Sequence, residues 1–125
     1  MADEIEEPTN EALKECLIAM AVESWRIGRV TAQLIEKVSP MEQSRHTGQL
    51  RWFRRSVEEA LALVGLRLVI TEGEHYDVGM AATPLNIEEF AAEDELIVEQ
   101  MLEPIIMGPQ GIVKTGTVVL RKATE

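Results

Sequence analysis

The sequence has little of what would place it among secreted or membrane proteins. Cys16 is its only cysteine, so a disulfide framework is excluded and a reducing compartment is expected. No apolar run approaches the roughly 18 residues that a membrane span needs. The N-terminus is acidic and lacks the positive start of a secretory signal. We therefore expect a cytoplasmic protein with no membrane segment, and Cys16 as a buried, inert thiol.

Positive charge is also scarce. The formal net charge is -10 at pH 7, and no Lys or Arg occurs between Val69 and Val113. Binding to nucleic acid needs clustered cations that replace counterions, so we expect no nucleic-acid partner. An acidic chain is better suited to a basic protein surface, which it would find by electrostatic steering. The simpler alternative is that acidic charge only keeps a small protein soluble.

Side chains that could perform chemistry are few and form no motif. Cys16, His46 and His75 have no nucleophile, base and orienting group arranged around them. The acidic stretch around His75 lacks the spacing of an EF-hand or a zinc site. The glycine turn at residues 108–111 has Pro109 where a phosphate loop would need backbone N–H donors. We predict no enzyme activity, no cofactor and no metal.

The first half of the chain has helical periodicity. Residues 1–8 form a predicted flexible acidic tail, and residues 9–65 a helical dimerisation stem. Thr9 or Asn10 can cap the first helix. Apolar residues then recur every seven positions through Val38, with a second seam of small and apolar residues behind them, which is a heptad pattern. The first seam consists of Leu13, Met20, Ile27 and Leu34, and the second of Leu17, Ser24, Thr31 and Val38.

A second helix is predicted to begin at Pro40 and to end at Gly65. Ser39 and Glu42 form a capping box around Pro40, which is favoured at the first helical position. The two helices fold back as a hairpin or continue as a bent rod, and they pair within or between chains. Apolar residues on more than one side of the first helix favour a bundle. The predicted dimer interface consists of Leu13, Leu17, Met20, Ile27, Leu34, Leu50, Phe53 and Val57.

The second helix is the basic part of the chain. With Trp52 among the arginines, a nucleic-acid patch is one interpretation, but we favour ion pairs with the acidic remainder, within or between subunits. We expect His46 to be packed or at an interface rather than a ligand. The cationic residues of the stem in question are Arg26, Arg29, Arg45, Arg51, Arg54 and Arg55.

Residues 66–125 are predicted to form a small acidic β-head. Short apolar runs separated by glycine and proline are typical of a compact unit with tight turns. The predicted strands are residues 66–70, 95–103, 105–107, 112–114 and 117–120, with 76–84 extended or irregular and 85–95 a loop or short helical turn. The fold class is therefore α+β: an N-terminal helical hairpin or long helices (a dimeric bundle) followed by a small, mainly antiparallel β domain, a barrel or sandwich.

Stem and head together resemble GrpE, the nucleotide-exchange factor of DnaK-type chaperones, over about residues 13–122. In that family a helical section, a glycine and a strand are followed by a stretch with Asp and Ala, as in residues 64–82 here, with Val78 and Met80 in place of the family's Pro and His. Acids preceding an apolar strand, residues 94–102, and the final strands, residues 111–120, are also similar.

The resemblance implies a homodimer whose paired helices form a four-helix bundle and whose heads promote ADP release from a DnaK-type chaperone. The family's partner-binding positions correspond to Tyr76, Val78, Met101 and Leu120, although packing in the head is the alternative for each. The arginine that the family points at the chaperone is replaced by Gly111 or Ile112, and the long N-terminal coiled coil is missing. The alternative function is therefore a non-catalytic interaction or scaffold module that reuses the fold.

Overall fold

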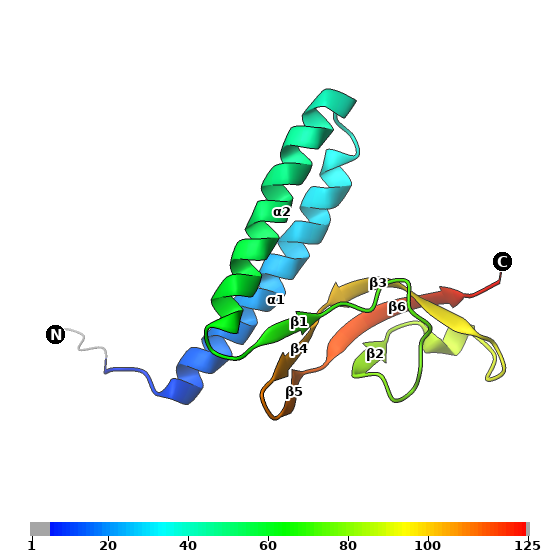
Figure 1. The fold of residues 1–125 in the computed structure, drawn as a ribbon. Coiled ribbons are helices and arrows are strands. Elements are labelled where there is room, and N and C mark those ends of the chain that lie inside the picture. Colours follow the sequence, from blue (N-terminus) through cyan, green and yellow to red (C-terminus); the bar gives the residue numbers. More distant parts are fainter. Residues whose placement is uncertain (1–5, 125) are drawn as a thin grey trace.

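The structure is a computed structural model that describes residues 6–124. Helices α1 (Asn10–Ile35) and α2 (Pro40–Ala62) form a hairpin that stands on a head of short strands (Figure 1). The α+β class predicted from the sequence is confirmed. Most of the predicted tail, residues 1–8, lies outside the described part of the chain. No helix in that part has a stretch long and apolar enough to cross a membrane.

Helix α1 begins where the sequence predicts and ends slightly earlier. The Thr9 hydroxyl accepts a hydrogen bond from the Ala12 backbone N–H at 3.0 Å, which caps the first turn. The helix ends at Ile35 rather than Val38, with Glu36 as its C-cap. Ser39 precedes proline and is therefore extended, with ψ at 152°, so the chain must leave the helix before it.

Helix α2 begins with the predicted capping box. The Ser39 hydroxyl accepts from the Glu42 backbone N–H at 3.4 Å, and Pro40 occupies the first turn. The Gln43 side chain donates to the Val38 carbonyl at 3.0 Å, which holds the turn closed. The described chain is thus an αα-hairpin and not a bent rod (Figure 1). Helix α2 ends at Ala62, and Gly65, with φ at 78°, redirects the chain into the head.

The head consists of two small sheets. The first has the strand order β1-β4-β5 and the second the order β2-β6-β3. All strand pairs are antiparallel except β2 with β6, so the prediction of a mainly antiparallel domain holds. Strand β2 was expected only as extended or irregular chain. The bounds are β1 Arg67–Val69, β2 Ala82–Pro84, β3 Leu96–Glu103, β4 Ile105–Gly108, β5 Gly111–Lys114 and β6 Gly116–Lys122, with a 3-10 turn η1 at Ile87–Glu89.

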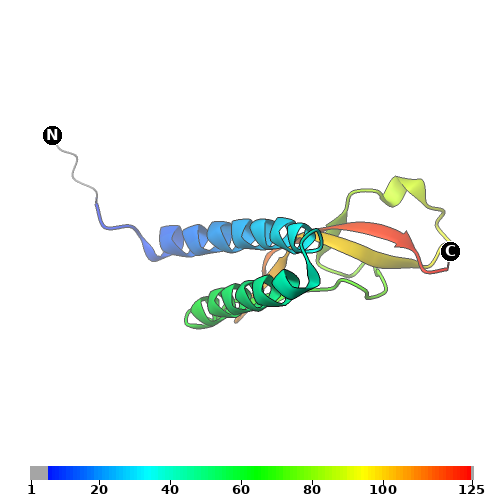
Figure 2. The ribbon, with the colours of Figure 1, turned by 90° about the horizontal axis from the view of Figure 1, so that it is seen from above.

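Hairpin and head share their cores. One core joins Ala21 and Val22 of α1 and Leu61 of α2 to Leu66 and Ile106 of the head. A second core consists of head residues and Trp25 of α1. Seen from above, α1 and α2 lie side by side and the head extends away from them (Figure 2). The helices therefore complete the interior of the head and do not merely support it.

Candidate interaction surfaces

Trp25 fixes the position of the head on the hairpin. Its side chain is buried, and its indole N–H donates to the Met101 carbonyl of β3 at 2.9 Å. The Arg54 guanidinium of α2 lies over the Trp25 ring, 5.2 Å from its centroid. Gly28 gives that guanidinium room, because a Cβ there would lie 3.1 Å from Arg54 Nε. One indole thus links both helices to the central strand of the head.

Ionic contacts surround this joint. The Arg26 guanidinium pairs with the Glu103 carboxylate, which also accepts from the Thr117 hydroxyl at 3.0 Å and lies 3.7 Å from Lys114 Nζ. Arg29 donates to the Gln100 side chain at 3.1 Å. Burial alone would raise the pKa of Glu103, but the hydrogen bonds from Arg26 and Thr117 and the nearby positive charges outweigh it, so the pKa is lowered below its ordinary value. These contacts join residues far apart in sequence.

The first predicted seam lies on the surface of the described chain. Its residues form an apolar line along α1, and Met20, the most exposed of them, is 65% exposed. Leu17 of the second seam is half-buried, as are Leu50 and Val57 of α2, while Phe53 lies at the edge of exposure. The exposed members of the first seam are Leu13, Met20, Ile27 and Leu34.

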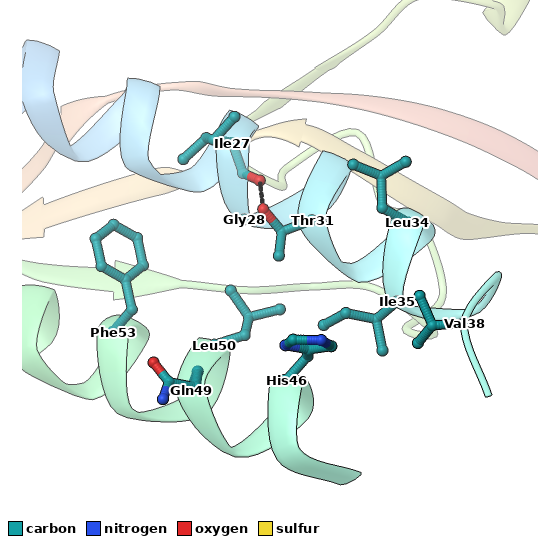
Figure 3. A pocket seen from close by; sticks show the side chains of 10 residues that line it. All are labelled: Ile27, Gly28, Thr31, Leu34, Ile35, Val38, His46, Gln49, Leu50 and Phe53. Atoms are coloured by element: carbon teal, nitrogen blue, oxygen red, sulfur yellow. Dashed lines mark hydrogen bonds between the residues drawn. The ribbon is translucent and has the colours of Figure 1, made fainter. Parts of the chain in front are cut away.

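An apolar groove continues this line into the space between the helices. The groove has a volume of about 510 Å³ and is lined mainly by apolar side chains. In Figure 3, Ile35 and Val38 of the α1 side face Leu50 and His46 of α2, with Ile27 and Phe53 farther along. The imidazole of His46 is half-buried in this groove, in agreement with a packed or interfacial role. We call the first seam and this groove together the seam face.

The head has a hollow of its own. The segment after β1 contributes Tyr76 and Val78, and the segment around η1 contributes Ile87 and Phe90, to a hollow of about 610 Å³. Val78 is 89% exposed, whereas Tyr76 is half-buried and packs against the core. Acidic side chains also line this head hollow: Asp77, Asp94 and Glu95.

Two hydrogen-bonded contacts hold the walls of the head hollow. The Asn86 side chain both donates to the Leu120 carbonyl and accepts from the Leu120 N–H, each at 2.9 Å. This clasp ties the segment before η1 to β6. On the other wall, the Tyr76 N–H donates to the Leu96 carbonyl at 2.9 Å. The hollow is therefore a built feature of the head with an apolar floor and an acidic rim.

The structure corrects two of the four predicted partner-binding residues. Met101 is 0% exposed and Leu120 is 2% exposed, and both belong to the core of the head. Strand β3 has register irregularities on either side of Met101, which turn that side chain inward. The Met101 N–H then donates to the Glu72 carboxylate at 2.8 Å instead of to the sheet. Tyr76 and Val78 come together in the head hollow, but Met101 and Leu120 do not join them at the surface.

Other predictions about single residues have mixed outcomes. Cys16 is exposed, not buried, because it lies on the side of α1 turned away from α2 and the head. Among residues 6–124, no three His, Cys, Asp or Glu side chains gather as a metal site would require. Arg26 pairs with the acidic head as expected. Arg51 and Arg55 form no ion pair with any described residue.

Sequence reasoning missed Trp25, Arg54 and Glu103 as the residues that join hairpin and head. The signal available for Trp25 was its position off the heptad seam, which indicated a second buried side of the helix without naming its partner. Comparison with known proteins adds no relative: no protein-family model, no curated protein and no solved structure matches this chain.

Proposed function

We propose that this chain is a GrpE-like co-chaperone that dimerises through its helices and promotes ADP release from a DnaK-type chaperone. The observation that supports this most directly is the order of elements: a helical hairpin with an exposed apolar face, followed by a two-sheet head with an acidic hollow. This order agrees with the likeness of residues 64–82, 94–102 and 111–120 to that family.

The seam face supports the dimer. Exposed Met20, Ile27 and Leu34 follow a heptad spacing and adjoin an apolar groove, so a second copy laid along α1 would bury them together. Apolar burial contributes roughly 25 cal/mol per Å² removed from water. Two hairpins joined in this way form a four-helix bundle with one head on each subunit.

The head hollow supports contact with a basic partner surface. Val78 offers an exposed apolar side chain beside Asp77 and Glu95, so it suits a partner with an apolar side chain flanked by cations. To release ADP, the head must bind the open form of the chaperone more tightly than the closed form. A tenfold shift between the two forms requires about 1.4 kcal/mol of differential binding.

The test is release of a fluorescent ADP from the DnaK-type chaperone of the same organism, followed by stopped flow. We expect the wild-type protein to accelerate release and Val78→Asp to reduce the acceleration. Leu85→Asp is the matched control, because Leu85 is also exposed on the head but lies outside the hollow. Absence of acceleration by the wild-type protein would refute the exchange activity.

A second candidate is a binding or scaffold module that has the fold without the exchange activity. It is favoured by Ile112, an exposed isoleucine in the region where the family has its chaperone-facing arginine. Capture from lysate of the native host separates the two candidates. Recovery of a DnaK-type chaperone that is lost in Val78→Asp supports the first, whereas recovery of a different assembly with no chaperone supports the second.

A further inference from the structure

The side of α2 that points away from α1 has the composition of a second binding surface. At about 100° per residue, Arg45, Gly48, Trp52 and Arg55 lie opposite the half-buried stripe of Leu50 and Val57 that faces α1. Arg51 lies beside them. We call these residues, Arg45, Gly48, Arg51, Trp52 and Arg55, the outer face of α2. The outer face belongs neither to the seam face nor to the head.

The outer face is positive in a strongly negative protein. From residue 43 to residue 57 there is no Asp or Glu, although the chain has a net charge of -10. Arg45 approaches Glu42 only to 3.8 Å, and Arg51 and Arg55 form no ion pair with a described residue. Arginines left without carboxylate partners in a chain so rich in carboxylates are available to an acidic ligand.

Trp52 gives the outer face an apolar centre. Its side chain is 70% exposed, in contrast to the buried Trp25. Exposed tryptophan flanked by arginine is the residue combination that dominates binding energy at protein interfaces. Trp52 and Arg45 line one shallow hollow of about 410 Å³, and Arg51 and Arg55 line another of about 350 Å³.

Gly48 is the second, independent observation. Glycine is unfavourable in the interior of a helix, and here neither packing nor backbone conformation requires it. A Cβ at Gly48 would meet nothing within 4 Å, and the residue has no positive φ. Alanine would therefore suit the single chain better. Gly48 also lines the hollow beside Trp52, so its missing side chain leaves room for a ligand to approach the helix closely.

We propose that the outer face of α2 binds an acidic segment of a partner protein, with carboxylates on Arg51 and Arg55 and an apolar side chain against Trp52 and Gly48. From Arg45 to Arg55 the face extends about 15 Å along the helix, which about five residues of extended peptide span. The acidic charge elsewhere on the chain repels a nucleic-acid backbone, and the apolar centre gives phosphate nothing to contact. This inference goes beyond the proposed exchange function.

The test uses the full chain and a fluorescein-labelled peptide of about eight residues in which Glu-Glu-Leu repeats, with a Gln-Gln-Leu peptide as its neutral counterpart. Binding is followed by fluorescence anisotropy at about 50 mM salt, where screening is modest. We expect the acidic peptide to bind and the neutral one not to. The double variant Arg51→Glu, Arg55→Glu should abolish binding, and Trp52→Ala should weaken it about thirtyfold.

Gly48→Ala separates binding from folding. We expect this variant to melt at a higher temperature than the wild-type protein and yet to bind the acidic peptide at least about tenfold more weakly, since its new methyl group occupies the hollow. A double variant on α1 and the turn, Lys14→Glu, Lys37→Glu, makes the same charge change away from the outer face. It should retain binding, and equal loss in both double variants would overturn the proposal.

Three other outcomes would also overturn the inference. The first is absence of binding to the acidic peptide. The second is tighter binding of a thymidine oligonucleotide of similar length, which would assign the face to nucleic acid. The third is a rise in mass with protein concentration that the Arg51→Glu, Arg55→Glu variant removes, which would assign the face to a second copy of this chain.

Discussion

Glu103 shows how one carboxylate can join the two halves of the molecule. It sits in β3, accepts a hydrogen bond from Thr117 of β6 and pairs with Arg26 of α1. Its pKa is lowered from the ordinary 4.5, because these partners outweigh the cost of burial. Most surface ion pairs contribute little, but this carboxylate is one of several groups that hold the head on the hairpin.

We predict that Glu103→Gln makes stability less dependent on pH. Because the folded-state pKa lies below the unfolded value of 4.5, the carboxylate stabilises the fold above about pH 4.5, and this contribution is lost as the pH falls through the folded-state pKa. The variant should therefore be about 1 kcal/mol less stable near neutral pH, and the difference should shrink in acid. Urea unfolding across the acidic range measures it, and a difference that stays constant with pH would contradict the assignment.

The roles of single residues were the hardest to predict from sequence. Alternation along a strand indicates that one side is buried but not which side. The irregular register around Met101 then breaks the alternation, so Val98 and Met101, three positions apart, are both in the core. The joint at Trp25 depends on contacts across 76 positions of sequence, which local patterns do not encode.

At the scale of elements, local signals were sufficient for most of the fold. Thr9, Ser39 and Pro40 act within one turn of chain, and for this reason the starts of both helices could be predicted from them. The strand pairings could not be, because β2 is only three residues long and pairs with a strand more than thirty positions away. The head hollow follows from that pairing, and sequence analysis therefore named only its residues Tyr76 and Val78.

The seam face leads to a prediction about α1. We expect Met20→Asp to convert a dimer into a folded monomer, because Met20 is exposed in the single chain but would be buried beside a second copy. A buried unpaired charge costs several kcal/mol, so dissociation should strengthen by about a hundredfold or more. Light scattering over a range of concentrations measures the mass. Ala19→Asp, one position earlier and also exposed, is the control and should remain dimeric.

A dimer that persists in Met20→Asp would show that the seam lies elsewhere. Leu34→Asp then provides a second probe, because Leu34 is exposed at the other end of the seam and also lines the groove. If both variants keep the mass and the circular dichroism of the wild-type protein, α1 is not the dimer surface.

For the whole molecule, the shared cores matter more than the division of the sequence into stem and head. The turn at Gly65 separates the two segments along the chain, but Leu61 of α2 and Leu66 of the head lie in one core, and Trp25 of α1 lies in the other. Neither segment buries its apolar surface without the other. The head therefore has a fixed orientation on the hairpin, as a wedge against a partner would require.

This arrangement predicts a single cooperative unfolding transition. In a Trp52→Phe background, fluorescence reports on Trp25 alone, and far-ultraviolet circular dichroism reports mainly on the helices. Because Trp25 contacts both α2 and β3, we expect the two signals to change at the same urea concentration. The midpoint should also rise with protein concentration, since a dimer is stabilised by mass action. Loss of the fluorescence signal well before the helical signal would mean instead that the head unfolds by itself and that the helices are stable without it.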